Sequence, residues 1–424
     1  MKMKRLFLMV AFAIALAATT YAQEKIILLN EGNWQMDNGR MTYFENGKIV
    51  SNSWFRDVNN MKLGDTPNDI IQINDQLIAI AINWSNIIQF ITPEGKAVAA
   101  TEDVPNNRRL ATDGTYVYVS SYGHECMTER GMMTFTKGFV AKIDTRTFKV
   151  VDAVEVGYEP EGIAYYKGFL FVANTGGYAF QEDHDYEKTV SIINAETMEK
   201  VRDIDTGQIN LYGEMSQSGR YLCVNSPGDY YEVPAAAIII DCEAALMGLS
   251  HTFTRLDYAA TYSTVTGDGK FLAVGSRFSY ITYEYLFNCI TIDPALAFES
   301  YGSQGVTETL PGTMAADIGK MQSPYGLYAN PYTGYMYATD AGSYAAGGEL
   351  YQWSPSGQLL GHYGVYINPS HFLALPPDGH FTGISSPVAD TGSELPMYDL
   401  SGRQLPSEPR RGIVIQGGKK RVRR

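Results

Sequence analysis

Short apolar runs, each ended by a tight turn, recur along this chain. The clearest example spans 156–178, where an apolar strand follows Pro160, a Lys167-Gly168 turn follows it, and a second apolar strand leads into a polar loop carrying Tyr178. Alternating or short apolar runs bounded by Gly and Pro are typical of antiparallel strands. This segment therefore predicts the first two strands of a repeated β-module.

Five further copies of the two-strand unit can be read from the sequence. Their first strands are expected at 66–73, 105–110, 211–215, 262–265 and 324–328, and their second strands at 76–84, 116–120, 221–225, 271–275 and 335–339. A third and a fourth strand follow, most clearly at 190–194 and 198–204. Four antiparallel strands per unit are typical of a propeller blade.

The two ends of the repeat region complement each other. Residues 25–34 read as a second strand with its loop, without a first strand before them, and 368–375 have the Pro-led pattern of a first strand without a full blade behind them. We expect these ends to complete one blade. The predicted fold is all-β: a seven-bladed β-propeller of four-stranded antiparallel blades over 24–384, at about 52 residues per blade.

The terminal segments differ from this pattern. Lys2, Lys4 and Arg5, an apolar run over 6–18 and the small-x-small site at 20–22 predict a cleaved signal peptide over 1–22 rather than a retained membrane anchor. No later apolar run is long enough for a membrane span. The domain organisation is thus signal peptide 1–22, propeller 23–384, linker 385–396 and a short basic tail 397–424, in a protein exported to the periplasm, outer cell surface or medium.

The charge distribution excludes one class of partner. The whole chain has a net charge of −13, and eight basic residues against one acidic residue lie within 403–424. With the three basic residues of the leader also set aside, 24–402 carry −23. An acidic body repels phosphate backbones, so nucleic acid is not an expected partner.

The four cysteines, Cys126, Cys223, Cys242 and Cys289, are widely spaced and form no C-x-x-C pattern, so they do not indicate a zinc or dithiol site. Export permits disulfides, and Cys223 and Cys242 fall on successive predicted strands. Buried free thiols are the preferred interpretation.

Two resemblances follow from particular motifs. The Gly-Tyr-Glu-Pro-Glu-Gly-Ile-Ala-Tyr and Leu-Phe-Val-Ala-Asn signature of the repeat resembles YncE-type seven-bladed propellers. The motifs at 29–34, 52–55, 63–65 and 83–87 more narrowly resemble DUF5074-type surface proteins, a group that includes cobalamin-capturing lipoproteins placed over an outer-membrane transporter. This chain lacks the lipoprotein cysteine of that group. The resemblance implies capture of a corrinoid-like nutrient, with an outer-membrane transporter or other surface protein as partner.

The tail has a resemblance of its own. The pattern at 398–403, 412–415 and 418–420 is similar to an abbreviated C-terminal sorting signal of type IX secretion. This resemblance implies display at the outer surface.

In a propeller, the loop that leaves the second strand and the loop that enters the first strand emerge on the same face, around the central channel. We therefore predict a ligand-binding mouth there, which every blade supplies with an aromatic residue. Flat amphipathic side chains with amide and Arg donors suit a large planar or glycan-like ligand. The predicted ligand-binding residues are Asn33, Trp34, Asp69, Trp84, Asn86, Arg109, Tyr122, His124, Glu161, Asn174, Tyr178, Tyr212, Tyr230, Arg277, Tyr325, Tyr344 and His371.

Other interpretations of these residues stay open. The Tyr and Trp residues could instead pack between adjacent blades, and His124 is expected to be a satisfied loop histidine. The acidic run 182–187 lacks EF-hand spacing, so a solvated loop is preferred over a calcium site there. Asp69, Glu161 and Glu214 could point toward the axis and hold calcium.

No G-x-S-x-G, H-E-x-x-H or Walker motif occurs in the chain, so the sequence favours a non-enzymatic binding protein without a cofactor. The alternatives are a calcium-dependent propeller hydrolase or lyase and a surface protein-interaction scaffold.

Overall fold

The structure is a computed structural model that describes residues 24–124, 136–179, 184–229, 232–279 and 284–381, together with four short strands near the C-terminus. For 276–279, 284–286 and the C-terminal strands it describes the backbone alone. The chain divides into two compact units, 1–386 and 387–424. The predicted leader 1–22 and linker 385–396 lie outside the described residues, as do Cys126 and Tyr230.

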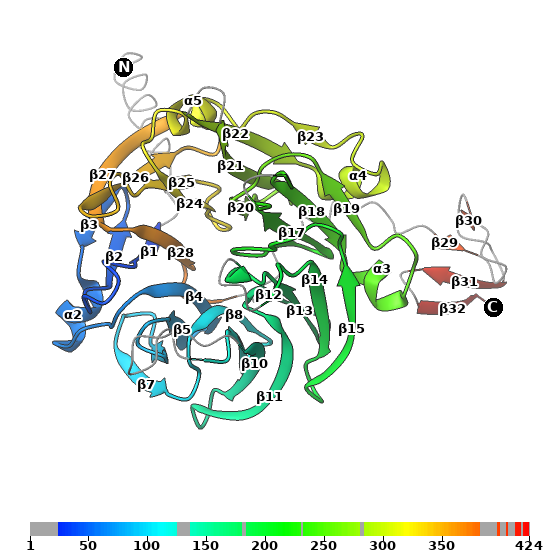
Figure 1. Ribbon diagram of the computed structural model, residues 1–424, viewed down its shortest axis with the longest axis horizontal. Helices are drawn as coiled ribbons and strands as arrows, with labels where there is room; N and C mark the ends of the chain where they lie inside the picture. The colour runs from blue at the N-terminus through cyan, green and yellow to red at the C-terminus, as the bar shows by residue number, and fades with distance from the viewer. Residues whose placement is uncertain are drawn as a thin grey trace, which may run out of the picture. The chain divides into compact units, whose positions relative to one another are not determined.

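Seven four-stranded antiparallel sheets in the larger unit form a ring, as Figure 1 shows. Blade 1 contains β28 (Pro369–Leu375), β1 (Lys25–Asn30), β2 (Arg40–Glu45) and β3 (Lys48–Ser51). Blade 2 contains β4 (Pro67–Asn74), β5 (Leu77–Ile82), β6 (Ile87–Ile91) and β7 (Ala97–Thr101). Blade 3 contains β8 (Asn107–Thr112), β9 (Tyr116–Ser121), β10 (Lys137–Asp144) and β11 (Lys149–Tyr158). Blade 4 contains β12 (Pro160–Tyr166), β13 (Phe169–Asn174), β14 (Thr189–Asn194) and β15 (Glu199–Asp205).

The remaining three blades have the same order. Blade 5 contains β16 (Ser216–Ser218), β17 (Tyr221–Ser226), β18 (Ala236–Asp241) and β19 (Phe253–Leu256). Blade 6 contains β20 (Tyr262–Val265), β21 (Phe271–Ser279), β22 (Glu284–Ile292) and β23 (Val306–Thr307). Blade 7 contains β24 (Pro324–Ala329), β25 (Met336–Asp340), β26 (Gly347–Trp353) and β27 (Leu359–Ile367).

The predicted closure of the ring is confirmed. β1, from the start of the described chain, pairs antiparallel with β28, from the end of the larger unit, with Lys25 opposite Leu375 and Leu28 opposite Phe372. The predicted all-β propeller of seven blades is therefore the observed fold.

Burial explains why the blades stand side by side. All six residues of the second strand β5 are buried, because both faces of the strand pack against neighbouring blades. In the outer strand β11, residues 149–155 are mostly exposed. The core consists of apolar clusters between adjacent blades, such as the one in which Ala79 and Phe90 of blade 2 meet Val117 and Ile143 of blade 3. Each fully buried apolar side chain stabilises the ring by about 1.5–3 kcal/mol.

The turn at Lys167-Gly168 matches its prediction. Both residues have positive φ, 46° and 89°. This is the backbone of a two-residue hairpin turn that matches the twist of its strands, and it requires a glycine or a residue that tolerates the left-handed region. The first strand of blade 5 differs from its prediction at 211–215. It is the three-residue β16, because Asn210 and Gly213 have positive φ, 56° and 88°, and turn the chain before it can extend.

Helices of five or six residues occupy some connections between strands. They are α2 (Trp54–Asn59), α3 (Cys242–Met247), α4 (Pro294–Glu299) and α5 (Met314–Ile318). None of the helices in the described residues is long and apolar enough to cross a membrane.

The smaller unit contains a four-stranded sheet in the order β30 (Gln404–Leu405), β29 (Met397–Tyr398), β31 (Gly412–Gln416) and β32 (Lys419–Arg423).

The described cysteines are free thiols, as the sequence favoured. Cys223 and Cys242 are buried and unpaired, and Cys289 is partly buried. Burial raises the pKa of Cys223 to about 12, so its thiol stays protonated and unreactive at neutral pH.

Candidate functional site

Irregularities near the start of the first strands position the side chains at the channel. In β8, the residues opposite Ser120 are Arg108 and Arg109, two against one. In β12 the same bulge contains Glu161, and in β28 it contains His371. A β-bulge leaves residues unpaired and redirects their side chains, so the chain delivers charged groups to the axis at the same place in several blades.

Glycines let neighbouring blades approach at this level. A Cβ on Gly162, beside Glu161, would lie 2.9 Å from the carbonyl oxygen of Gly213 in blade 5. A Cβ on Gly326, beside Tyr325, would lie 2.4 Å from the carbonyl oxygen of Ser370 in blade 1. The Pro-x-Gly pattern at 160–162 and 324–326 therefore has a packing reason, because only glycine fits where two inner strands come this close.

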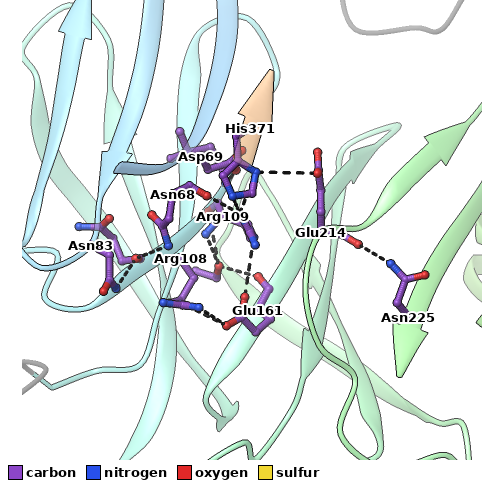
Figure 2. Close-up of polar contacts among 12 residues, drawn as sticks. Asn68, Asp69, Asn83, Arg108, Arg109, Glu161, Glu214, Asn225 and His371 are labelled. Carbon is purple, nitrogen blue, oxygen red and sulfur yellow. Dashed lines mark hydrogen bonds and ion pairs between the residues drawn. The ribbon is translucent and has the colours of Figure 1, made fainter. Parts of the chain in front are cut away.

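Arg109 connects four blades across the channel (Figure 2). From blade 3, its Nη1 donates to the carbonyl oxygen of Asn68 in blade 2 and lies 2.8 Å from Nε2 of His371 in blade 1. Its Nε lies 3.7 Å from Oε2 of Glu161 in blade 4. One buried guanidinium thus fixes the relative positions of side chains that are far apart in sequence.

Glu161 is the acidic centre of this network. Its side chain is fully buried, and its Oε1 accepts hydrogen bonds from Nε of Arg108 at 2.8 Å and from the hydroxyl of Tyr122 at 2.5 Å. The Arg108 guanidinium also lies over the Tyr122 ring, 4.9 Å from its centroid. Charge-assisted hydrogen bonds of this kind are about twice as strong as neutral ones and hold the carboxylate rigidly.

Side chains from opposite parts of the ring meet at this level. Nδ1 of His371 lies 4.0 Å from Oε2 of Glu214 in blade 5, and its Nε2 lies 3.8 Å from Oε1 of Glu31, which follows β1. Glu31 also accepts a hydrogen bond of 2.8 Å from the hydroxyl of Tyr325. We call Glu31, Asp69, Arg108, Arg109, Glu161, Glu214 and His371 the floor cluster, because they span the channel below the surrounding aromatic loops.

Burial dominates the electrostatics of the floor cluster. Desolvation raises the pKa of Glu31 and of Asp69, and Arg109 opposes both shifts. The channel walls and the charge of Asp69 raise the pKa of Glu214 to about 7. Desolvation, together with the charges of Arg109 and Arg108, lowers the pKa of His371 well below its ordinary value, so its imidazole is neutral at pH 7.

Aromatic side chains surround the floor cluster. Trp34 is 55% exposed and packs edge-on against Trp84, with 4.7 Å between ring centroids. Tyr325 packs against Tyr344 at 5.6 Å and Tyr262 at 6.2 Å. The Trp34 and Tyr344 loops also touch, because Nδ2 of Asn33 donates to the carbonyl oxygen of Tyr344 at 3.4 Å. We call Trp34, Trp84, Tyr212, Tyr262, Tyr325 and Tyr344 the wall aromatics.

Exposure divides the predicted aromatics into two groups. Tyr212 is 41% and Tyr344 is 48% exposed, which leaves their faces available. Tyr122 is 4% exposed, and Tyr178 packs edge-on against it at 5.6 Å. The alternative of packing between blades thus describes Tyr122, whereas Trp34, Tyr212 and Tyr344 remain open to a ligand.

Several residues that were predicted to bind a ligand instead stabilise loops. Asn174 is buried, donates to Thr189 and Ser191, and accepts from the backbone N–H of Gly157, so it has no free group for a ligand.

Asn86 has a φ of 57° and accepts the backbone N–H of Asn106, as a turn residue does. Asp69 accepts the backbone N–H groups of Ile70 and Leu110 and is buried.

The last three predicted residues add little to the site. His124 is buried, and its ring centroid lies 6.4 Å from that of Tyr122. Arg277 lies in β21, where the backbone alone is described, and Tyr230 lies outside the described residues.

Sequence reasoning missed Glu31 as a site residue and misjudged His184. Glu31 comes directly after the second strand of blade 1, and this position could have identified it as a site residue. His184, expected in a solvated acidic run, has a side chain only 6% exposed; its Nε2 lies 2.6 Å from the fully buried Glu159, and its ring stacks on Tyr158 at 4.0 Å. Glu159 is therefore paired with His184, whereas Glu161, two residues further on, belongs to the network around Arg109.

The motifs at 63–65 and 83–87, which carry the narrower resemblance, take part in hydrogen bonds between the loops of blades 1 and 2. The carboxylate of Asp65 accepts the backbone N–H of Asp37 at 2.9 Å, and the hydroxyl of Ser85 accepts the backbone N–H of Asp65 at 2.9 Å. The carbonyl oxygen of Gly64 accepts the N–H of Gly39 at 3.0 Å. These bonds brace the loops that carry Trp34 and Trp84.

Of the three carboxylates considered for calcium, Asp69, Glu161 and Glu214, two are already occupied. Asp69 is held by two backbone N–H groups and Glu161 by two arginines, so only Glu214 presents an open carboxylate. Among the described residues, no three His, Cys, Asp or Glu side chains are grouped as metal ligands.

Two hollows lie away from the floor cluster. One of about 150 Å³ is lined by 36–41 together with Ser53, Phe55, Arg56, Lys62 and Leu63. The other, of about 480 Å³, lies between 255–258 and 301–303. The mouth is the better candidate because buried charged groups from several blades meet there, and neither hollow has such a group.

Comparisons support the fold and no particular function. The chain is similar to Kuenenia stuttgartiensis hydrazine synthase, at 15% identity and a TM-score of 0.54 over 74% of this chain and 90% of that chain. Matches at lower TM-scores include apo AztD from Citrobacter koseri (9% identity, 0.45, 83% and 98%) and the Neurospora crassa Pan2 WD40 domain (12%, 0.44, 72% and 80%). No protein-family model and no curated protein matches the sequence. The class is a seven-bladed β-propeller with a charged floor at its channel mouth.

Proposed function

We propose that this protein is a non-enzymatic binding protein that captures a small ligand at the channel mouth. The observation that carries the proposal is the convergence of the floor cluster: side chains of blades 1, 3, 4 and 5 meet around Arg109 and His371. The wall aromatics stand around this floor, and three of them are largely exposed. This arrangement offers flat apolar faces and a few oriented polar groups, which are features of small-molecule sites.

The same geometry supports binding over catalysis. A general acid or base needs an accessible proton acceptor or donor beside the substrate. Glu161 and Asp69 are buried and already hold donors, and His371 is occupied by Arg109. Glu161, Asp69 and His371 therefore serve to fix the floor, and Glu214 is left accessible to a ligand.

A narrower proposal names the ligand and the cellular location of the protein. The motifs at 29–34, 63–65 and 83–87 resemble those of surface propellers that capture cobalamin. We therefore propose export through a cleaved leader, display at the outer surface, and a corrinoid-like nutrient as ligand, handed on to an outer-membrane transporter.

Calorimetric titration of the purified protein with cobalamin, cobinamide, haem and a glycan panel tests this function. We expect one class to bind and the double substitution Trp34→Ala with Trp84→Ala to weaken its affinity at least about tenfold, as expected when stacked aromatic surface is lost. Val151→Ala, at an exposed position on β11, is the control. Absence of binding in every class, or full affinity in the double variant, contradicts the proposal.

A scaffold function is the second candidate, and one observation favours it. Met247 and Leu249 at the end of α3, Leu296 on α4 and Tyr301 just beyond α4 are all exposed large apolar residues. Exposed apolar groups of this kind can mark protein contacts. A pull-down from an outer-membrane fraction should then lose its partner on Met247→Asp with Tyr301→Asp and keep it on Trp34→Ala.

A further inference from the structure

The floor cluster contains more carboxyl groups than guanidinium groups. It contains four carboxylates, Glu31, Asp69, Glu161 and Glu214, against the guanidiniums of Arg108 and Arg109. Both guanidiniums lie against Glu161. His371 does not restore the balance, because its ring is neutral at pH 7. Both guanidiniums are therefore engaged by Glu161, whereas the ion-pair contacts of Glu31 and Glu214 among the described residues are with His371.

Glu214 is the most solvent-exposed of the carboxyl groups compared next. Its side chain is 55% exposed, compared with 17% for Glu31 and 0% for Glu161. Within the part of the chain that the structure describes, the nearest cationic or imidazole nitrogen to its carboxylate is Nδ1 of His371, at 4.0 Å. Nη1 of Arg109 lies 2.8 Å from Nε2 and 3.2 Å from Nδ1 of that ring, so the imidazole is held between Arg109 and Glu214.

Buried polar atoms at the same level also lack hydrogen bonds. They are Nε of Arg109, Oε2 of Glu161 and Oδ1 of Asn68, none of which has a hydrogen-bond partner among the described residues. Glu161 is fully buried and Asn68 is 4% exposed. An unsatisfied buried acceptor destabilises the folded state unless a water or a ligand donor reaches it. Nε of Arg109 and Oε2 of Glu161 face each other as an ion pair at 3.7 Å, so Oδ1 of Asn68 is the acceptor of this group that an added N–H donor would satisfy.

The wall aromatics suit the same kind of ligand. An aromatic face attracts a cation through its quadrupole, and most strongly where water is excluded. Tyr212, Tyr344 and Trp34 present such faces, and Tyr325 links the wall to Glu31 through its hydroxyl. An anionic ligand would need the arginines, which Glu161 already holds.

We propose that the channel mouth recognises an organic cation, a ligand whose ammonium or guanidinium group lies against Glu214 and Glu31 while its body contacts the wall aromatics. This inference rests on the proposed function of the mouth as a binding site and names another class of ligand for it, because a corrinoid carries no ammonium or guanidinium group. Glu214 is the anionic anchor, and the floor cluster behind it excludes anions.

Matched indole probes test the charge preference. Tryptamine carries an ammonium group, tryptophol a neutral hydroxyl in the same place, and indole-3-acetate a carboxylate. Calorimetry of the full chain at about pH 8 should show tryptamine binding about tenfold or more tighter than tryptophol, and no binding of indole-3-acetate. In Glu214→Gln the tryptamine advantage should fall to within about twofold, whereas Glu196→Gln, at an exposed turn position of blade 4, should keep it.

The pH dependence gives a second readout. Asp69 of β4, Arg109 of β8, His371 of β28 and Tyr328 of β24 are the titratable or charged groups around Glu214. Because the pKa of Glu214 is raised to about 7, its charge is lost as the pH falls from 8 to 6. Tryptamine affinity should fall over this range, and tryptophol affinity should not.

The outcomes separate the two proposals. Equal binding of tryptamine and tryptophol, or an advantage that survives in Glu214→Gln, overturns the cation inference and leaves a ligand-binding mouth intact. A failure of these probes together with the corrinoid, haem and glycan panel overturns both.

Discussion

Two buried carboxylates in this propeller have opposite surroundings. Glu24, just before β1, is 4% exposed and accepts hydrogen bonds from Asn330, Thr333 and Gln352, at 3.3, 3.2 and 2.7 Å. All three donors are neutral and come from blade 7, beside the sheet that closes the ring. Glu161 at the channel mouth is fully buried and is held by two guanidiniums and a tyrosine.

The two carboxylates have different roles: Glu24 helps to close the ring, and Glu161 organises the channel mouth. Burial raises the pKa of Glu24, and its hydrogen bonds to neutral partners only partly oppose the rise. Neutral donors can satisfy either protonation state, so this carboxyl acts as a clasp between blades 1 and 7. Guanidiniums instead bind an ionised partner more strongly than a neutral one, so the Glu161 network holds charged groups at the channel mouth.

The largest effect should come from removing the charge of Glu161. In Glu161→Gln, Arg108 and Arg109 remain in the channel without their counter-charge, and breaking a buried pair in this way costs about 3–5 kcal/mol. Chemical denaturation should show this loss in the free energy of unfolding, with Glu196→Gln unchanged as control. A loss below about 1 kcal/mol would show that water replaces the carboxylate and that the network is not structural.

Substitution of Glu24 should destabilise the protein less than substitution of Glu161 does. Glu24→Ala leaves the donors of Asn330, Thr333 and Gln352 unsatisfied and should lower the free energy of unfolding by about 2 kcal/mol. Glu24→Gln keeps an acceptor in place and should recover at least half of this loss. If both variants unfold alike, the hydrogen bonds of the clasp contribute nothing to closure.

The pH dependence of the clasp follows from the direction of its pKa shift. The folded state raises the pKa of Glu24 above 4.5, so the folded protein binds this proton more tightly than the unfolded chain does. The resulting stabilisation is full below pH 4.5 and is lost as the pH rises through the folded pKa. The gap in unfolding free energy between Glu24→Gln and the natural protein should therefore move in favour of the variant as the pH rises. A gap independent of pH contradicts the shift.

The smallest effect is expected at Glu214. Its carboxylate is half exposed and lies near Asp69, so Glu214→Gln removes repulsion at pH 8 and should raise the melting temperature by about 1–2 °C. The same variant is expected to weaken binding of a cation. Stability and recognition would then oppose each other at one residue, whereas a loss of stability would assign Glu214 a structural role.

Much of the fold was readable from local patterns. The strands of blade 4, the Lys167-Gly168 turn and the pairing of the two chain ends all match, because apolar alternation and turn residues act over a few neighbours. The first strand of blade 5 was misplaced, because Asn210 and Gly213 have positive φ and the strand begins only at Ser216. His184 was misjudged because its acidic neighbours in sequence are not its neighbours in space.

The mouth was only partly readable. The positions after second strands and before first strands correctly predicted Arg109, Glu161 and His371 near the axis. They also included Asn174, which the structure buries in a loop network, and omitted Glu31. The position of a residue in the repeat predicts at which end of a blade it lies. It does not predict whether the side chain turns toward the channel.

By itself, the sequence determined the number of blades, the order of their strands and the closure of the ring, because these depend on hydrophobic period and turn chemistry within each repeat. Tertiary structure alone decided which charges meet. Arg109, Glu161, Glu214 and His371 come from four blades, and bulges at the starts of β8, β12 and β28 direct three of them to the axis. A bulge and its direction depend on how neighbouring blades pack, and this packing exists only once the ring has closed.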